Sequence, residues 1–166
     1  MKYAFAIALT LFALTHPVGA QVLAAGTSAP EIDLASLDGA RVQPSALHGH
    51  PVVVSLWVTW CLPCKEEFPE LVRIFRAHSA AGLHVLAVNG RDRESSAWAV
   101  RKFAERYAAI FPIALYETGM MRSTYKITGL PTTVFVDTAG VIRLVNVGPI
   151  SATELDRGVA LILPKR

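Results

Sequence analysis

Two cysteines, Cys61 and Cys64, are the only cysteines in this chain of 166 residues, and Leu62 and Pro63 separate them. A Cys-x-x-Cys pair can act in three ways: as a structural disulfide, as part of a metal site, or as a dithiol that exchanges electrons with other disulfides. Each way needs different surroundings, so the rest of the sequence can distinguish among them.

The first two ways have little support. A bridge from Cys61 to Cys64 closes a very small loop, so it restricts the unfolded chain little and stabilises the fold little. A structural zinc site needs four ligands, but the chain has no second cysteine pair and its five histidines are scattered. His48 and His50 are interpreted as surface residues of a loop. The pattern favours a redox pair, and we expect no metal and no cofactor.

The hydrophobic pattern predicts the elements that position the cysteines. Pro51–Val58, PVVVSLWV, is a nearly continuous apolar and β-branched run, which is typical of a strand buried on both faces of a sheet. After Cys64 the period changes, because Phe68, Leu71 and Phe75 fall on one face of a helix. The cysteines therefore lie where a central strand turns into a helix.

The other predicted elements give an α/β pattern. Strands are expected at His84–Asn89, Pro112–Tyr116, Thr132–Asp137 and Val141–Val147, and helices at Ser95–Ala109, Met120–Tyr125 and Ser151–Leu163. Ser151 and Glu154 have the spacing of a capping box at the start of the last helix. Helices that alternate with strands, followed by a hairpin, predict βαβ crossovers with an antiparallel addition.

The helix start gives the two cysteines different roles. Backbone N–H groups there favour a thiolate, so Cys61 is expected to be exposed and to attack a substrate disulfide. Cys64, facing inward, would attack the mixed disulfide and release the reduced substrate. Glu67, one turn after Cys64, could take its proton if it faces inward. A solvated glutamate is the alternative, and Glu66 and Glu70 are equally available on pattern alone.

The N-terminus has the order of a secretory signal peptide over residues 1–20. Lys2 precedes an uncharged apolar run, and small residues at 18–20 supply a cleavage site before Gln21. An uncleaved membrane anchor is the alternative, although the run is short for a bilayer span. The sequence predicts export to the periplasm.

The remaining residues 21–166 are expected to form a single domain, because their number suits one hydrophobic core. Residues 21–30 are predicted to be a short mobile leader. The formal net charge of +3 and the lack of a basic run give no support to nucleic-acid binding.

These motifs together resemble the thioredoxin superfamily, and more closely its bacterial extracytoplasmic branch of TlpA and ResA-like thiol–disulfide oxidoreductases. The resemblance covers residues 27–163 and implies a thioredoxin-like α/β fold, with a central mixed β-sheet flanked by helices and an N-terminal extension. The motifs that carry it are Leu47-x-Gly49-x-Pro51, Trp60-Cys61-x-Pro63-Cys64, Glu67-x-Pro69, Gly129-x-Pro131-Thr132-Thr133 and Gly148-Pro149.

The resemblance also implies site residues. Pro131 should be the family's cis-proline, packed against the cysteine pair, and the Leu130 backbone should be available to pair with substrate. Glu67 matches the family's active-site glutamate. Trp60 is interpreted as an exposed platform beside the thiol, with packing as the alternative. The expected substrate-binding residues are Trp60, Leu62, Pro63, Leu130 and Pro131.

The resemblance implies a reductant of protein disulfides, acting on apocytochrome c or on copper-site assembly proteins. It also implies a membrane thiol–disulfide electron donor, and we expect a monomer. Two departures matter. Ser55 stands where cytosolic thioredoxins carry a buried aspartate, which leaves Glu67 as the candidate proton acceptor. Thr132 stands where cytochrome-maturation reductants often have glutamate, which weakens a dedicated haem-pathway assignment.

Three other functions on the same fold remain open: a disulfide-forming oxidant, a non-redox binding chaperone, and peroxidase-like chemistry. The pair Leu62-Pro63 carries no charge, which disfavours a strong oxidant. The intact set of Trp60, Glu67 and Pro131 argues against an idle cysteine pair. The sequence shows no separate peroxidatic cysteine.

Overall fold

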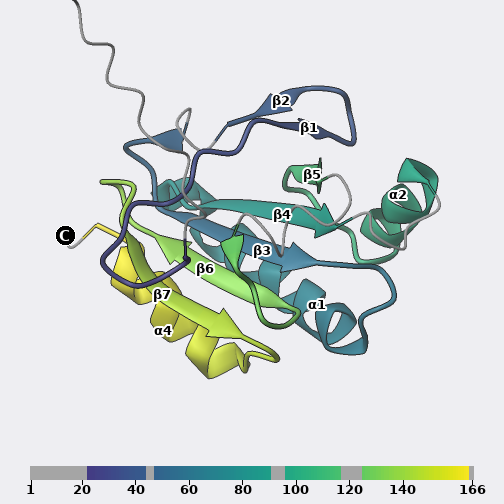
Figure 1. The fold of residues 1–166 in the computed structure, drawn as a ribbon. Coiled ribbons are helices and arrows are strands. Elements are labelled where there is room, and N and C mark those ends of the chain that lie inside the picture. The colour runs from purple at the N-terminus through teal and green to yellow at the C-terminus, as the bar shows by residue number, and fades with distance from the viewer. Residues whose placement is uncertain (1–21, 44–46, 91–95, 117–124, 165–166) are drawn as a thin grey trace, which may run out of the picture.

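The computed structural model describes residues 22–43, 47–90, 96–116 and 125–164. One mixed sheet is built in the order β2-β1-β5-β4-β3-β6-β7 (Figure 1). β3, β4 and β5 are parallel, and the strands on either side of these three are antiparallel. The strands are β1 (Leu34–Ser36), β2 (Arg41–Val42), β3 (Val52–Trp57), β4 (His84–Gly90), β5 (Ile113–Tyr116), β6 (Thr132–Val136) and β7 (Ile142–Val147).

The helices are α1 (Leu62–His78), α2 (Ala97–Arg106) and α4 (Ala152–Ile162), and the short 3₁₀ turn η2 (Ser79–Ala81) follows α1. All three helices bury apolar side chains against one face of the sheet. Trp57 of β3 lies with its ring centroid 4.6 Å from Phe68 of α1 and 4.5 Å from Phe103 of α2. Leu155 of α4 is fully buried in the same cluster. This main core includes both cysteines.

Irregular chain from the N-terminus helps to cover the other face of the sheet. Ile32 packs there with Leu56, Val88 and Tyr125 in a second apolar cluster. The prediction of a mobile leader is wrong for the part of it that the structure describes, because that part pairs with β7. Gly26 N donates to Ile142 O at 2.8 Å, and Ile142 N donates to Thr27 O at 2.9 Å. The outer edge of β7 offers backbone groups that the leader satisfies.

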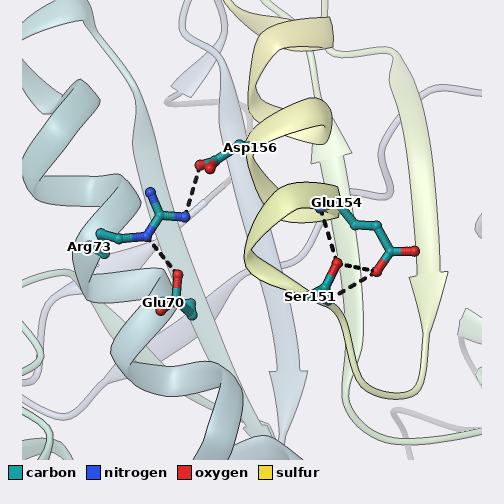
Figure 2. Close-up of polar contacts among 5 residues, drawn as sticks. All are labelled: Glu70, Arg73, Ser151, Glu154 and Asp156. Atoms are coloured by element: carbon teal, nitrogen blue, oxygen red, sulfur yellow. Dashed lines mark hydrogen bonds and ion pairs between the residues drawn. The ribbon is translucent and has the colours of Figure 1, made fainter.

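Polar contacts join α1 to α4 in what we call the α1–α4 seam, made of Glu70, Arg73 and Asp156 (Figure 2). The Arg73 guanidinium donates to Glu70 Oε2 at 2.6 Å and to Asp156 Oδ1 at 2.8 Å. Beside it, α4 begins with the predicted capping box. Glu154 N donates to Ser151 Oγ at 3.2 Å, and Ser151 N donates to Glu154 Oε2 at 3.0 Å.

The prediction of a central mixed sheet flanked by helices is confirmed, and each predicted strand begins and ends within a residue of the observed one. The β1–β2 hairpin was not predicted. Residues 1–20, Ser95 and most of the predicted helix Met120–Tyr125 lie outside the described residues. Within the described ranges, no helix combines the length and the apolar character needed to cross a bilayer.

Candidate active site

The cysteine pair lies at the junction of β3 and α1, as the sequence predicts. Cys61 is the N-cap of α1, and its Sγ is bonded to Cys64 Sγ with an S–S length of 2.08 Å and a Cα–Cα distance of 5.2 Å. Cys64 N donates to Cys61 Sγ at 3.2 Å. A backbone N–H and the positive end of the helix dipole would therefore stabilise a thiolate on Cys61 once the bridge is reduced.

Both cysteines are largely covered, which corrects the expectation of an exposed Cys61. Cys61 is 7% exposed and Cys64 is 1% exposed, and both belong to the main core. The N-cap position turns Cys61 Sγ back toward its own helix, so only a small part of it reaches the surface. The neighbouring side chains of Trp60 and Leu62 are 51% and 65% exposed, so an approaching substrate meets an apolar surface beside Cys61.

Glu67 faces inward and is 3% exposed, unlike the exposed Glu66 and the half-buried Glu70. Its Oε1 accepts hydrogen bonds from Thr133 Oγ1 at 2.7 Å and from Ser55 Oγ at 3.3 Å. Burial raises the pKa of the Glu67 carboxyl above its ordinary value, and the two hydroxyl hydrogen bonds oppose that rise. Helical pattern alone left the three glutamates equally available, and the one that the resemblance implied, Glu67, is the buried carboxyl on this helix.

The loop before β6 supplies the cis-proline. The Leu130–Pro131 peptide bond is cis, as the resemblance implied. Thr132 pairs with Leu56, so Pro131 lies at the end of β3 from which the chain runs to Cys61. Leu130 packs against the core cluster that contains both cysteines. The cysteine pair and the cis-proline loop therefore lie at the same end of the sheet, where β3 ends and β6 begins.

Two further residues reach the site that sequence reasoning did not assign to it. Ser55 was noted only as a departure and Thr133 only as part of a motif, yet both donate to Glu67. Each is a polar residue within a buried strand, and that was the available signal. Asn89 in β4 has the same signature, since its fully buried amide makes no hydrogen bond with the described residues.

The scattered histidines do not converge on the cysteines. His78 and His84 stand at a spacing that zinc sites can use. Within the described residues, however, no three histidine, cysteine, aspartate or glutamate side chains are grouped in a way that could hold a metal ion. His50 and His84 contact one another edge to face, with ring centroids 4.8 Å apart, at the opposite end of β3 and β4 from the cysteines.

The site has the parts for dithiol–disulfide exchange. A helix start stabilises one sulfur, a second sulfur lies within bonding distance, and a buried carboxyl lies one turn further along the helix. Together with the mixed sheet and the cis-proline, these parts define a thioredoxin-like thiol–disulfide oxidoreductase.

Comparison with known proteins gives the same result. The chain belongs to the AhpC/TSA family, whose pattern it matches over residues 25–145. It is 31% identical to the thiol-disulfide oxidoreductase ResA of Geobacillus kaustophilus over 142 residues, which cover 86% of this chain and 80% of that protein. It is 33% identical to the thioredoxin-like protein YneN of Bacillus subtilis over 136 residues, which cover 82% and 79% of the two chains.

A solved structure supports the fold assignment. A candidate thiol:disulfide interchange protein DsbE from Chlorobium tepidum superposes with a TM-score of 0.77 at 28% identity. The superposition covers 86% of this chain and 99% of that one. The sheet, the flanking helices and the cysteine pair thus belong to a known class of thiol–disulfide oxidoreductases.

Proposed function

We propose that this oxidoreductase works as a reductant of protein disulfides outside the cytoplasm. The observation that supports this direction is the modest stabilisation available to the Cys61 thiolate. Among the residues that the structure describes, one backbone N–H, that of Cys64, donates to its sulfur, and the intervening residues Leu62 and Pro63 carry no charge. Strong oxidants need the opposite, a thiolate so stabilised that the reduced form is strongly favoured.

The exchange begins when the Cys61 thiolate attacks a sulfur of a substrate disulfide. A Cys61–substrate disulfide forms, and one substrate sulfur leaves as a thiolate. Glu67 then takes the proton of Cys64, and the Cys64 thiolate attacks Cys61 Sγ. The bond from Cys61 to the substrate breaks, the second substrate sulfur leaves as a thiolate, and the Cys61–Cys64 disulfide remains. A membrane thiol–disulfide donor would return two electrons to this disulfide.

The substrate surface comprises residues that surround Cys61 or lie beside the cis peptide bond. Trp60 and Leu62 offer exposed apolar area, and the backbone of Leu130, next to the cis peptide bond, is proposed to pair with the substrate. Pro63 and Pro131 complete the set. Apocytochrome c and copper-site assembly proteins are the proposed substrates. We further propose a monomer of one domain over residues 21–166, exported to the periplasm by a cleaved segment at residues 1–20.

The reduction potential of the Cys61–Cys64 couple tests the direction of electron flow. A reductant should have a potential near that of thioredoxin, about −270 mV. Pro63→His is the matched variant, because a histidine between the cysteines would stabilise the Cys61 thiolate and make the couple more oxidising. A potential near −120 mV in the unaltered protein, the value typical of a strong oxidant, would instead identify a disulfide-forming enzyme.

Trapping identifies the substrate. In a Cys64→Ala variant the attack by Cys61 can still occur but the resolving step cannot, so mixed disulfides should accumulate in periplasmic extracts. Cys61→Ser is the control and should trap nothing. Captured apocytochrome c or copper-site assembly proteins would support the proposed substrates. Capture of neither, by a variant that still forms a mixed disulfide with a small disulfide, would rule them out.

A further inference from the structure

Glu67 is held from one side by a pair of hydroxyl groups on neighbouring strands. Ser55 of β3 and Thr133 of β6 are directly opposite each other in the antiparallel ladder, so their side chains point to the same face of the sheet. That face is the one α1 covers. Both hydroxyl-bearing residues are buried, at 1% and 0% exposure, so water does not compete for their hydrogen bonds.

Both hydrogen bonds reach the same carboxyl oxygen of Glu67. Thr133 Oγ1 and Ser55 Oγ both donate to Oε1, at 2.7 Å and 3.3 Å. Oε2 is buried and accepts no hydrogen bond from the described residues. A carboxyl group whose first oxygen already accepts two donors carries an incoming proton on its second oxygen, because the donors favour negative charge where they point.

We propose that Ser55 and Thr133 are positioning residues that fix the Glu67 carboxyl so that Oε2 exchanges a proton with Cys64 Sγ. In the resolving step the Cys64 S–H bond breaks, its proton moves to Oε2, and the electron pair left on sulfur attacks Cys61 Sγ. The substrate sulfur leaves with the electrons of the broken disulfide bond. This assignment rests on the proposed role of Glu67 as the proton acceptor.

The hydroxyls also set how readily Glu67 accepts the proton near neutral pH. Burial raises the pKa of its carboxyl, and the bonds from Thr133 and then Ser55 lower it. Without them the pKa of the carboxyl would rise further, so Glu67 would stay protonated to a higher pH and accept the Cys64 proton less readily. The Thr133 bond is the shorter of the two, so its loss has the larger effect.

The test follows the two steps separately in the full chain. Mixing the reduced protein with an aromatic disulfide whose thiolates are coloured releases one coloured thiolate when Cys61 attacks. A second is released when Cys64 resolves the mixed disulfide. The rate of the second release is measured as a function of pH. In the unaltered protein it should rise with pH as Glu67 loses its proton.

Thr133→Val removes the hydroxyl but keeps the shape of the side chain. We expect the pH dependence of the second release to move to higher pH. The rate should fall roughly tenfold at the pH where the unaltered protein is half-maximal, as expected for one hydrogen bond to a charged group. Thr133→Ser keeps the hydroxyl and should behave like the unaltered protein, and Ser55→Ala should show a smaller shift. The first release should keep its rate throughout, which a merely structural defect would not allow.

Thr132→Val is the matched control. It deletes another buried hydroxyl of β6, one that donates to Gly129 O at 2.8 Å and not to Glu67, so the pH midpoint of the second release should stay in place. An equal shift in Thr132→Val and Thr133→Val, or in Thr133→Ser and Thr133→Val, would overturn the assignment.

Glu67→Gln separates the two levels of the proposal. If Glu67→Gln loses the pH-dependent second release while Thr133→Val matches the unaltered protein at every pH, Glu67 is the base and the hydroxyls do not position it. If Glu67→Gln leaves the second release unchanged, the role of Glu67 fails and the positioning role fails with it.

Discussion

Two of the three glutamates of helix α1, Glu67 and Glu70, lie one turn apart in opposite surroundings. Glu67 is 3% exposed and bonds only uncharged hydroxyls among the described residues, and burial raises the pKa of its carboxyl. Glu70 lies in the α1–α4 seam and pairs with Arg73, whose side chain is 41% exposed (Figure 2). The two residues are of the same type and lie in the same helix, so their burial and their hydrogen-bond partners alone account for their different surroundings.

The comparison separates a part of α1 that serves chemistry from a part that serves stability. A carboxyl kept in an apolar core costs free energy, and a carboxyl with a perturbed pKa beside a reactive group is typical of a functional site. A surface ion pair costs little and contributes little. The N-cap Cys61 and the first half of α1, with Cys64 and Glu67, should therefore control activity, and the seam should control only stability.

The largest expected effect is the loss of activity on removing the nucleophile. Cys61→Ser should lower disulfide-reductase activity by a factor on the order of a thousand or more, because a hydroxyl is not ionised at neutral pH and cannot attack a disulfide. Arg73→Ala, in the seam, should keep the activity of the unaltered protein. Both variants are compared in an insulin-reduction assay on folded samples. A loss of activity in Arg73→Ala as large as that in Cys61→Ser would show that the seam also serves activity.

The second effect is on stability, and it depends on pH. Since the pKa of Glu67 is raised in the folded protein, the carboxyl costs no stability below its unfolded pKa of about 4.5, where both states are protonated. As pH rises from there toward the folded pKa, the unfolded state ionises first and stability is lost. Glu67→Gln should remove this loss, so it should gain stability relative to the unaltered protein as pH rises from about 4.5 toward neutral.

Denaturant unfolding of the oxidised protein at several pH values measures this difference. Glu70→Gln is the matched control on the same helix, and its stability relative to the unaltered protein should change little over the same range. A stability gap between Glu67→Gln and the unaltered protein that stays constant from pH 4 to pH 8 would show that Glu67 is ionised like an ordinary surface carboxyl.

Much of the fold followed from sequence patterns that one strong physical effect determines. The apolar run PVVVSLWV can be buried only in a central strand, and Ser151 with Glu154 satisfies helix-end N–H groups in one way. The β1–β2 hairpin was not predicted because its strands are short and β1 joins the sheet through β5, far along the chain. The leader was predicted to be mobile because it binds the edge of β7 through backbone hydrogen bonds, and such bonds leave no hydrophobic pattern in the sequence.

The site was partly predictable for a similar reason. Cys61 and Cys64 stand out by type and spacing, and Pro131 by its motif. Helical periodicity alone could not distinguish Glu67 from Glu66 and Glu70, because all three are compatible with a helix surface, and only the family motif Glu67-x-Pro69 favoured Glu67. The tertiary contact between α1 and the β3–β6 pair gives the physical reason why Glu67 faces inward, and that contact joins residues far apart in sequence.

The smallest expected effect concerns the seam itself. The Arg73–Asp156 pair joins α1 to α4, and both side chains are about half exposed, at 41% and 51%. Water and salt screen such a pair, so a double-mutant cycle with Arg73→Ala and Asp156→Ala should give a coupling free energy of about 0.2–1 kcal/mol that decreases in high salt. The cycle is read from denaturant unfolding at neutral pH.

Glu70 complicates this cycle in a useful way, because it also binds Arg73. Replacing Asp156 leaves the guanidinium with Glu70 in the same helix, whereas replacing Arg73 leaves Glu70 and Asp156 unpaired. Arg73→Ala should therefore cost more than Asp156→Ala, though each remains near the surface-pair range. A coupling several times larger and insensitive to salt would mean that the seam behaves like a buried ion pair, and the contrast between Glu70 and Glu67 would then be one of partner rather than of burial.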